Sequence, residues 1–298
     1  MLAVLVALLG GVGLAFSLFL VRAAAKAGQL KLRLEPMLFA VGANFLDTLG
    51  IGSFAPTLAW MRFRRMVPDK WIPMTMLAGY TPPVFVQSII FLILLGVSVD
   101  PILLIGSACA ITVGALVGAP IAAASRVRTV QLIVAAALLM AALFYSLSNL
   151  GLMPVGGTAA GLPLPLMLAA IVASFVFGVL LNFGVGNYAP TLAMLSLMGM
   201  NPRLAFPIMA FGAAIAGAAA SSRLVKLADL DLRIVLSLAV GSIPGVLVAA
   251  FIVKEMPLTM LRWLVVAVVV YAAITLLFAA FKRPAPGADE RLERALVD

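Results

Sequence analysis

Long apolar runs, separated by short polar or basic segments, make up nearly the whole chain. Each run is long enough to cross the hydrocarbon core of a membrane as an α-helix, which takes about 20 residues. The uninterrupted runs lie at residues 1–21, 71–96, 101–124, 130–150, 204–222, 233–253 and 259–281. The pattern predicts an all-α polytopic membrane protein with about seven full spans.

Two further apolar runs, at residues 37–64 and 167–199, are broken in the same way. The first contains Gly-Ile-Gly-Ser-Phe-Ala-Pro-Thr-Leu-Ala at residues 50–59, and the second contains Gly-Val-Gly-Asn-Tyr-Ala-Pro-Thr-Leu-Ala at residues 184–193. Further matches are 134 positions apart: Leu46 with Leu180, Met66 with Met200, Pro68 with Pro202 and Pro73 with Pro207. Later matches are 131 positions apart: Asp100 with Asp231 and Gly114 with Gly245.

These matches divide the chain into a leading helix and two copies of one unit. The expected parts are a leading transmembrane helix (1–21), repeat 1 (37–150), repeat 2 (166–281) and a charged tail (282–298). Internal repeats of this length are typical of membrane transporters.

The distribution of Lys and Arg indicates how the broken segments meet the membrane. If each segment crosses the bilayer, the alternating loops hold 9 and 11 basic residues, which gives no bias. If each segment enters and leaves on one side, as a re-entrant hairpin, one side holds 17 basic residues and the other holds only Arg203, Lys254 and Arg262. The positive-inside rule favours the second arrangement.

With two re-entrant hairpins, each repeat crosses the membrane three times, so the second repeat is inverted relative to the first. The sequence predicts a leading helix and two inverted repeats, each a broken re-entrant segment followed by three transmembrane helices. The N-terminus is expected outside and the C-terminus in the cytoplasm, at the inner membrane. Basic residues follow the first apolar run and none precedes it, so this span is expected to remain uncleaved.

Composition excludes several classes of protein. Hydrophobic residues make up 64% of the chain and charged residues 10%, with a mean hydropathy of +1.21, which excludes a soluble domain. The net charge of +9 is explained by membrane topology, and no nucleic-acid partner is expected. With no His and a single cysteine, Cys109, neither a metal site nor a cofactor is expected, and Cys109 is expected to be a packed thiol. The expected partners are the lipid bilayer and a small anion, and a homodimer is left open.

The broken segments predict a binding site for a small anion. Their glycines permit a turn, Pro56 and Pro190 suit the first turn of a helix, and Ser53 and Asn187 suit its N-cap. Short helices are expected at about 54–64 and 188–199, with N-termini that face each other near the middle of the membrane. Unpaired N–H groups and the helix dipole make such ends suitable for an oxyanion. The expected substrate-binding residues are Gly50, Gly52, Ser53, Phe54, Thr57, Gly184, Gly186, Asn187, Tyr188 and Thr191.

The alternative is that Gly and Pro only kink two ordinary spans. Two breaks at matched positions, together with the charge distribution, favour the binding site.

Asp47 is the one acid well inside an apolar run. Because intramembrane carboxylates are costly and usually functional, Asp47 is a candidate proton carrier. It could instead cap a helix or bind a backbone amide, since the matching residue of the second repeat is Leu181. Other polar residues expected near the site, as candidate pathway residues, are Asn44, Thr48, Asn182, Tyr80, Thr81 and Gln87.

Two Gly-x-x-x-Gly segments, at residues 114–118 and 241–245, predict close helix packing. The second repeat also contains Met-Asn-Pro-Arg-Leu-Ala-Phe-Pro (200–207), a Gly/Ala/Ser-rich span, and Asp-Leu-Arg (231–233) before its Gly-x-x-x-Gly segment. Together with the two broken segments, this arrangement resembles the sulfite exporter TauE/SafE family of permeases. The chain departs from that pattern in its turns, Gly-Ile-Gly-Ser and Gly-Val-Gly-Asn, where the family has runs of three or four glycines.

The resemblance implies a secondary transporter that carries small sulfur-containing anions, such as sulfite, thiosulfate or organosulfonates, across the cytoplasmic membrane. The alternatives are a carrier or channel for another small anion, such as a carboxylate or a halide, and uptake rather than export. An enzyme is not expected, because the chain has no His base for a serine protease and one buried acid where an aspartyl protease needs two.

Overall fold

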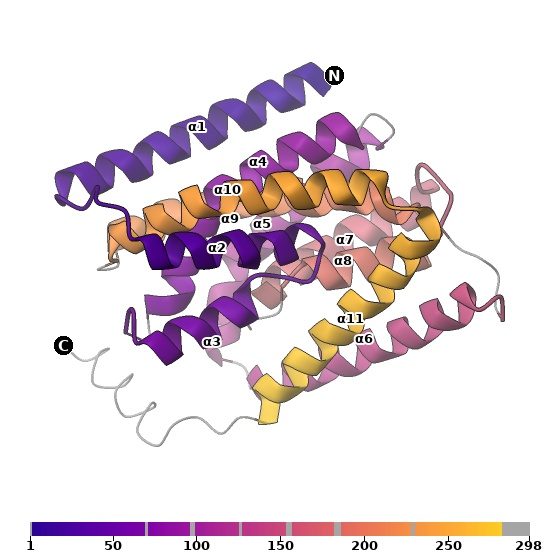
Figure 1. Ribbon diagram of the computed structural model, residues 1–298. Helices are drawn as coiled ribbons and strands as arrows, with labels where there is room; N and C mark the ends of the chain where they lie inside the picture. The colour runs from indigo at the N-terminus through magenta and orange to yellow at the C-terminus, as the bar shows by residue number, and fades with distance from the viewer. Residues whose placement is uncertain are drawn as a thin grey trace.

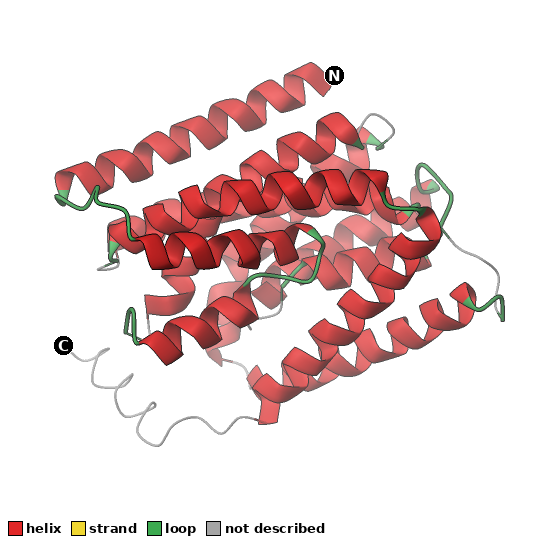
Figure 2. Ribbon diagram, in the orientation of Figure 1, coloured by secondary structure: helices red, strands yellow, loops and turns green. Residues whose placement is uncertain are grey.

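The computed structural model describes residues 2–68, 71–95, 99–124, 127–152, 157–181, 186–227 and 230–281. This part of the chain is helical, with short connecting loops (Figures 1 and 2). The helices are α1 (Leu2–Lys26), α2 (Leu34–Thr48), α3 (Phe54–Arg64), α4 (Ile72–Leu94), α5 (Pro101–Ala124), α6 (Val127–Asn149), α7 (Leu164–Leu181), α8 (Tyr188–Leu197), α9 (Pro202–Leu227), α10 (Leu232–Glu255) and α11 (Leu258–Phe281). The chain is therefore an all-α, multi-pass membrane protein.

Among the described residues, seven helices are long and apolar enough to cross a membrane: α1, α4, α5, α7, α9, α10 and α11. The number matches the expected spans, but the set differs in two members. Within the described residues α6 counts only over Gln131–Leu147, although the whole helix has 23 residues, and α7 qualifies with 18 residues although it belongs to a broken segment. At 1.5 Å per residue, α7 is about 27 Å long.

Matched residues begin matched helices. Asp100 Oδ1 accepts a hydrogen bond from the Ile102 N–H at 2.8 Å at the start of α5. Asp231 Oδ1 accepts one from the Arg233 N–H at 3.0 Å at the start of α10. Both carboxylates satisfy N–H groups that the first turn of a helix leaves unpaired, which explains why this acid recurs in the second copy.

Each broken segment turns back on itself, so that its two ends meet. At the first, Arg64 Nε and Nη2 donate to the Glu35 carboxylate at 2.5 and 3.0 Å, and the rings of Phe39 and Trp60 stack with centroids 4.1 Å apart. At the second, residues 159 and 200 form an isolated backbone bridge. The open ends of the two hairpins, where the chain enters and leaves each one, lie at opposite ends of the helix bundle, left and right in Figure 1.

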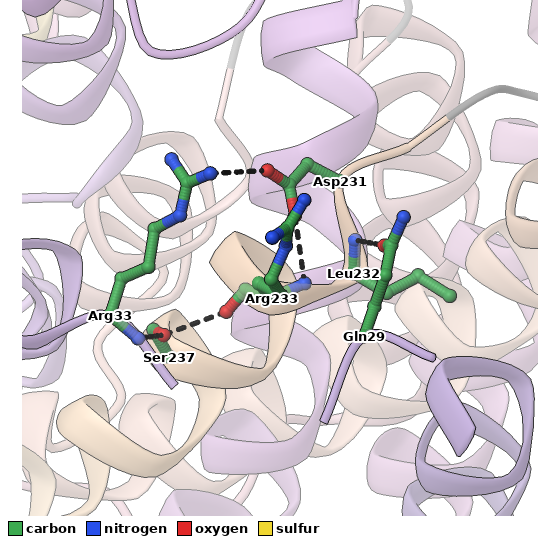
Figure 3. A network of polar contacts seen from close by, with 6 residues as sticks. All are labelled: Gln29, Arg33, Asp231, Leu232, Arg233 and Ser237. Atoms are coloured by element: carbon green, nitrogen blue, oxygen red, sulfur yellow. Dashed lines mark hydrogen bonds and ion pairs between the residues drawn. The ribbon is translucent and has the colours of Figure 1, made fainter. Parts of the chain in front are cut away.

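Other loop contacts agree with this arrangement. Near the start of α10, Arg33 forms an ion pair with Asp231 at 3.0 Å, and its N–H donates to Ser237 Oγ at 2.7 Å (Figure 3). The Gln29 side chain accepts a hydrogen bond from the Leu232 N–H in the same cluster (Figure 3).

Two further contacts join helix ends elsewhere in the bundle. Arg203 donates to the Met256 carbonyl, and Arg128 lies over the ring of Phe281. Each joins helix ends that the hairpin arrangement places on one side of the membrane. If the broken segments crossed the bilayer, Arg128 and Phe281 would lie on opposite sides.

The helices pack in a crossed pattern. α2 packs on α10 and α7 packs on α5, while α4 and α9 meet at the centre of the bundle, where the rings of Phe91 and Phe206 are in edge contact with centroids 5.3 Å apart. α1 lies along the outside, against α4 (Figure 1).

The prediction for the glycine segments is confirmed at three glycines, because Gly114, Gly241 and Gly245 each lie against the backbone of the neighbouring helix. The expectation for Cys109 is wrong: its side chain is exposed on α5. An apolar helix face in a membrane can meet lipid, so a small apolar residue there need not be packed.

Candidate functional site

The first break is a glycine turn between α2 and α3. Gly50 and Gly52 have φ angles of 91° and 94°, a region that side-chain-bearing residues rarely adopt. The turn lies inside the bundle, because a β-carbon at Gly50 would be 3.7 Å from Leu192 of α8 and 3.8 Å from Phe206 of α9. The glycines therefore bring the first break against the short helix of the second.

At the start of α3, polar groups are joined by a row of hydrogen bonds that runs from Asp47 through Ser53 and Thr57 to Tyr80. Asp47 Oδ1 accepts from both the N–H and the hydroxyl of Ser53, at 2.8 and 2.9 Å. Thr57 Oγ1 donates to the Ser53 carbonyl at 2.6 Å and lies 2.7 Å from the Tyr80 hydroxyl, and the Phe54 ring meets Tyr80 edge-on at 6.4 Å between centroids. The two hydrogen bonds from Ser53 to Asp47 favour the interpretation of Asp47 as a helix cap over that of a free proton carrier.

The second break presents α8 differently. Asn187 occupies the N-cap position, as expected, but its side chain makes no capping hydrogen bond. Asn187 and Thr191 are 7% and 4% exposed, and both line a small pocket. The other lining residues are Ser107, Ile111, Ser174, Ile208, Met209 and Gly212. The pocket therefore combines the first turn of α8 with surfaces of α5, α7 and α9.

One face of α4 connects the two breaks. Tyr80 contacts Thr57 of α3, and Gln87 Oε1 accepts a hydrogen bond from the Tyr188 hydroxyl of α8 at 3.5 Å. Because Tyr80 and Gln87 are two helical turns apart, they project from the same face of α4, about 10 Å from each other along its axis. The starts of α3 and α8 are thus gathered along a single helix.

The remaining predicted site residues are placed as follows. Both amide atoms of Asn44 are buried and have no hydrogen-bond partner among the described residues. Thr48 donates to the Asn44 carbonyl at 2.8 Å, so its hydroxyl serves the helix backbone. Thr81 donates to the Leu77 carbonyl and lies 3.4 Å from Ser221 Oγ on α9, away from the two short helices. Gly186 is exposed, whereas Asn182 and Gly184 lie outside the described residues.

Sequence reasoning missed Ser107 and Ser174, which line the pocket from α5 and α7. Neither stands out in the sequence, since each is a single serine within an apolar run, and only the packing of α5 on α7 brings them together. The lining residues include no Lys or Arg, so the polar groups that this pocket offers a ligand are neutral.

Comparison with known proteins finds one family that matches part of the chain. Residues 166–297, which include the whole second repeat, match the family described as Sulfite exporter TauE/SafE. No curated protein and no solved structure matches the chain. The match covers the second half of the chain and supports the resemblance found in the sequence.

Proposed function

We propose that this protein is a secondary transporter that carries small sulfur-containing anions, such as sulfite, thiosulfate or organosulfonates, across the cytoplasmic membrane. One observation supports the proposal above the others. In a chain of high hydropathy, two helices begin inside the bundle, and α4 joins their starts through Tyr80 and Gln87. Helix starts carry unpaired N–H donors and about half a positive charge each, a combination suited to an oxyanion.

We also propose that residues 37–150 and 166–281 act as two inverted repeats. The open ends of the two hairpins lie at opposite ends of the bundle (Figure 1), as inversion requires. In this orientation the N-terminus is outside, and the base of the first hairpin, with Glu35 and Arg64, faces the cytoplasm.

Transport would occur by alternating access around the helix starts. Inverted repeats can exchange conformations, so that one fold opens first to one side and then to the other. The ligand stays near the middle while the surrounding helices change their packing.

Uptake into proteoliposomes tests the function. Purified protein should accelerate the entry of at least one labelled sulfur oxyanion, and an excess of unlabelled substrate inside should drive exchange. A panel of sulfite, thiosulfate, methanesulfonate, acetate and chloride separates sulfur anions from the carboxylate and halide alternatives. Saturation together with exchange indicates a carrier, whereas large currents without exchange indicate a channel. Entry equal to that in empty liposomes for every anion would refute the proposal.

A further inference from the structure

The two helix starts are built on matched residues but use their polar groups differently. Ser53 and Thr57 in the first repeat correspond to Asn187 and Thr191 in the second, 134 positions later. At the α3 start, both Ser53 donors point to Asp47 Oδ1, and the Thr57 hydroxyl is hydrogen-bonded. The polar side chains of this start are therefore paired within the protein.

Among the described residues, the α8 start has no such internal partner. Leu181 takes the position that matches Asp47, and Asn187 leaves its capping capacity unused while it lines the pocket with Thr191. Gln87, which is fully buried, accepts from Tyr188 but has no partner for its Nε2 among the described residues. Buried donors without acceptors are rare and costly, so this start is suited to an acceptor supplied from outside.

We infer that the anion binds at the start of α8 alone, and that the Asp47 carboxylate is an internal anion that occupies the start of α3. This inference rests on the proposed function and specifies its site. Asp47 gives Ser53 the oxygen acceptor that a bound oxyanion would otherwise give. Each chain therefore takes up one external anion, held by Asn187 and Thr191 in the pocket.

The charges around the site define the class of ligand. Two helix starts contribute about one positive charge in total, and the Asp47 carboxylate contributes one negative charge. The turn after Asp47 lies against α8, because a β-carbon at Gly50 would be 3.7 Å from Leu192, so the Asp47 charge also acts on a ligand bound at the start of that helix. These charges cancel, and the lining has no Lys or Arg, so a ligand is held by neutral donors only. In a medium of low dielectric constant, a second negative charge on the ligand therefore adds a further large cost. The site therefore selects singly charged oxyanions, such as sulfonates, over doubly charged ones, such as sulfate and thiosulfate, and this narrows the proposed substrates to the singly charged ones.

Calorimetric titration of the purified protein tests this inference, with methanesulfonate and sulfate as probes. The wild type should bind one methanesulfonate per chain and bind sulfate at least tenfold more weakly. Asn187→Ala removes a donor to a charged group and should weaken methanesulfonate binding by about 10- to 100-fold. The factor by which Asn187→Ala weakens methanesulfonate binding should be at least ten times the factor for the matched change Ser53→Ala. Asp47→Asn removes the internal charge and should raise sulfate affinity at least tenfold relative to methanesulfonate.

The outcomes separate the inference from the function on which it rests. If Ser53→Ala weakens binding as much as Asn187→Ala, or if Asp47→Asn leaves the preference for methanesulfonate unchanged, the inference is overturned, but the protein still binds anions. If the wild type binds neither probe nor any other sulfur oxyanion at about 50 mM, the proposed function fails as well. Thermal unfolding checks that each variant folds. If one does not, the pair Thr191→Val and Thr57→Val replaces the first comparison, and Asp47→Ser replaces Asp47→Asn.

Discussion

Gly245 of α10 lies against the main-chain carbonyl of Val41 of α2, so closely that a β-carbon at position 245 would overlap the carbonyl oxygen. Gly114 of α5 meets the carbonyl of Phe175 of α7 in the same way. The two contacts are equivalent, because Gly114 matches Gly245 and Val41 matches Phe175 in the repeat alignment. Each broken segment is therefore packed on the fourth helix of the other repeat, and the two repeats exchange a helix.

The exchange defines which parts can move as one body. α2 and α4 pack on α10, and α3 contacts α2 and α4. In the same way α7 and α9 pack on α5, and α8 contacts α7 and α9. A motion of one whole repeat against the other would separate the two tight glycine contacts. A motion of these exchanged units would instead change the α4–α9 interface at the centre, next to the helix starts, and leave the glycine contacts intact.

Substitution of the glycines tests the tight contacts. Gly245→Ala and Gly114→Ala should each lower the free energy of unfolding by about 1–3 kcal/mol, because the added methyl group forces the helix backbones apart. Gly42→Ala is the matched control on α2, where a β-carbon would meet nothing within 4 Å. It should be neutral or stabilise the helix by up to about 1 kcal/mol. Unfolding curves in detergent measure all three, and wild-type stability of Gly245→Ala would contradict the close packing.

Paired cysteines test the exchanged units, in a Cys109→Ser background. A link between Arg33→Cys and Ser237→Cys, whose positions are in contact, joins α2 to α10 within one unit and should leave transport unchanged. A link between Thr81→Cys and Ser221→Cys, whose hydroxyl oxygens are 3.4 Å apart in the native protein, joins α4 to α9 across units and should block transport until it is reduced. The reverse result would show that the repeats themselves move as units.

Single cysteines test the orientation of the hairpins. Glu35→Cys and Arg64→Cys should react with a membrane-impermeant thiol reagent only from the cytoplasmic side, because their native side chains are paired at one end of the bundle. Arg203→Cys and Lys254→Cys should react only from outside. Reaction of Arg203→Cys or Lys254→Cys from the cytoplasm would overturn the inverted topology.

The positions of the helices and of the two breaks could be predicted from the sequence, because the breaks contain glycine and proline, whose effects on backbone conformation are specific. Gly50 and Gly52 take the positive φ angles that favour glycine, and α3 and α8 begin at Phe54 and Tyr188, as the positions of Ser53 and Asn187 predict. The distribution of basic residues predicted hairpins, and at the first one the structure joins Glu35 to Arg64. These features could be predicted because they depend on residue type and on charge, which a single sequence contains.

The sequence could not predict which helices pair. In a membrane, lipid-facing and protein-facing sides are both apolar, so periodicity does not identify a helix's neighbour. The packing of α2 on α10, and the pocket that α5, α7 and α9 form with Asn187, are therefore seen only in the structure. Thr81 illustrates the same limit: its position along the chain suggested the site, but its hydroxyl lies near Ser221 instead.

Asp47 is the residue on which the alternatives for coupling differ most clearly. Its contact with Ser53 predicts that Asp47→Ala lowers the free energy of unfolding by about 1–3 kcal/mol, because the buried Ser53 N–H loses its acceptor. Asp47→Asn keeps an acceptor oxygen and should cost less. If Asp47 is a cap and internal anion, the ratio of methanesulfonate uptake at about pH 6 to that at about pH 8 should be the same in Asp47→Asn as in the wild type. Methanesulfonate suits this measurement because it keeps one charge at both values, so only the protein can titrate. If the pH 6 to pH 8 ratio in Asp47→Asn differs from the wild-type ratio, Asp47 is the proton carrier. Unfolding curves at both pH values exclude loss of the fold as the cause.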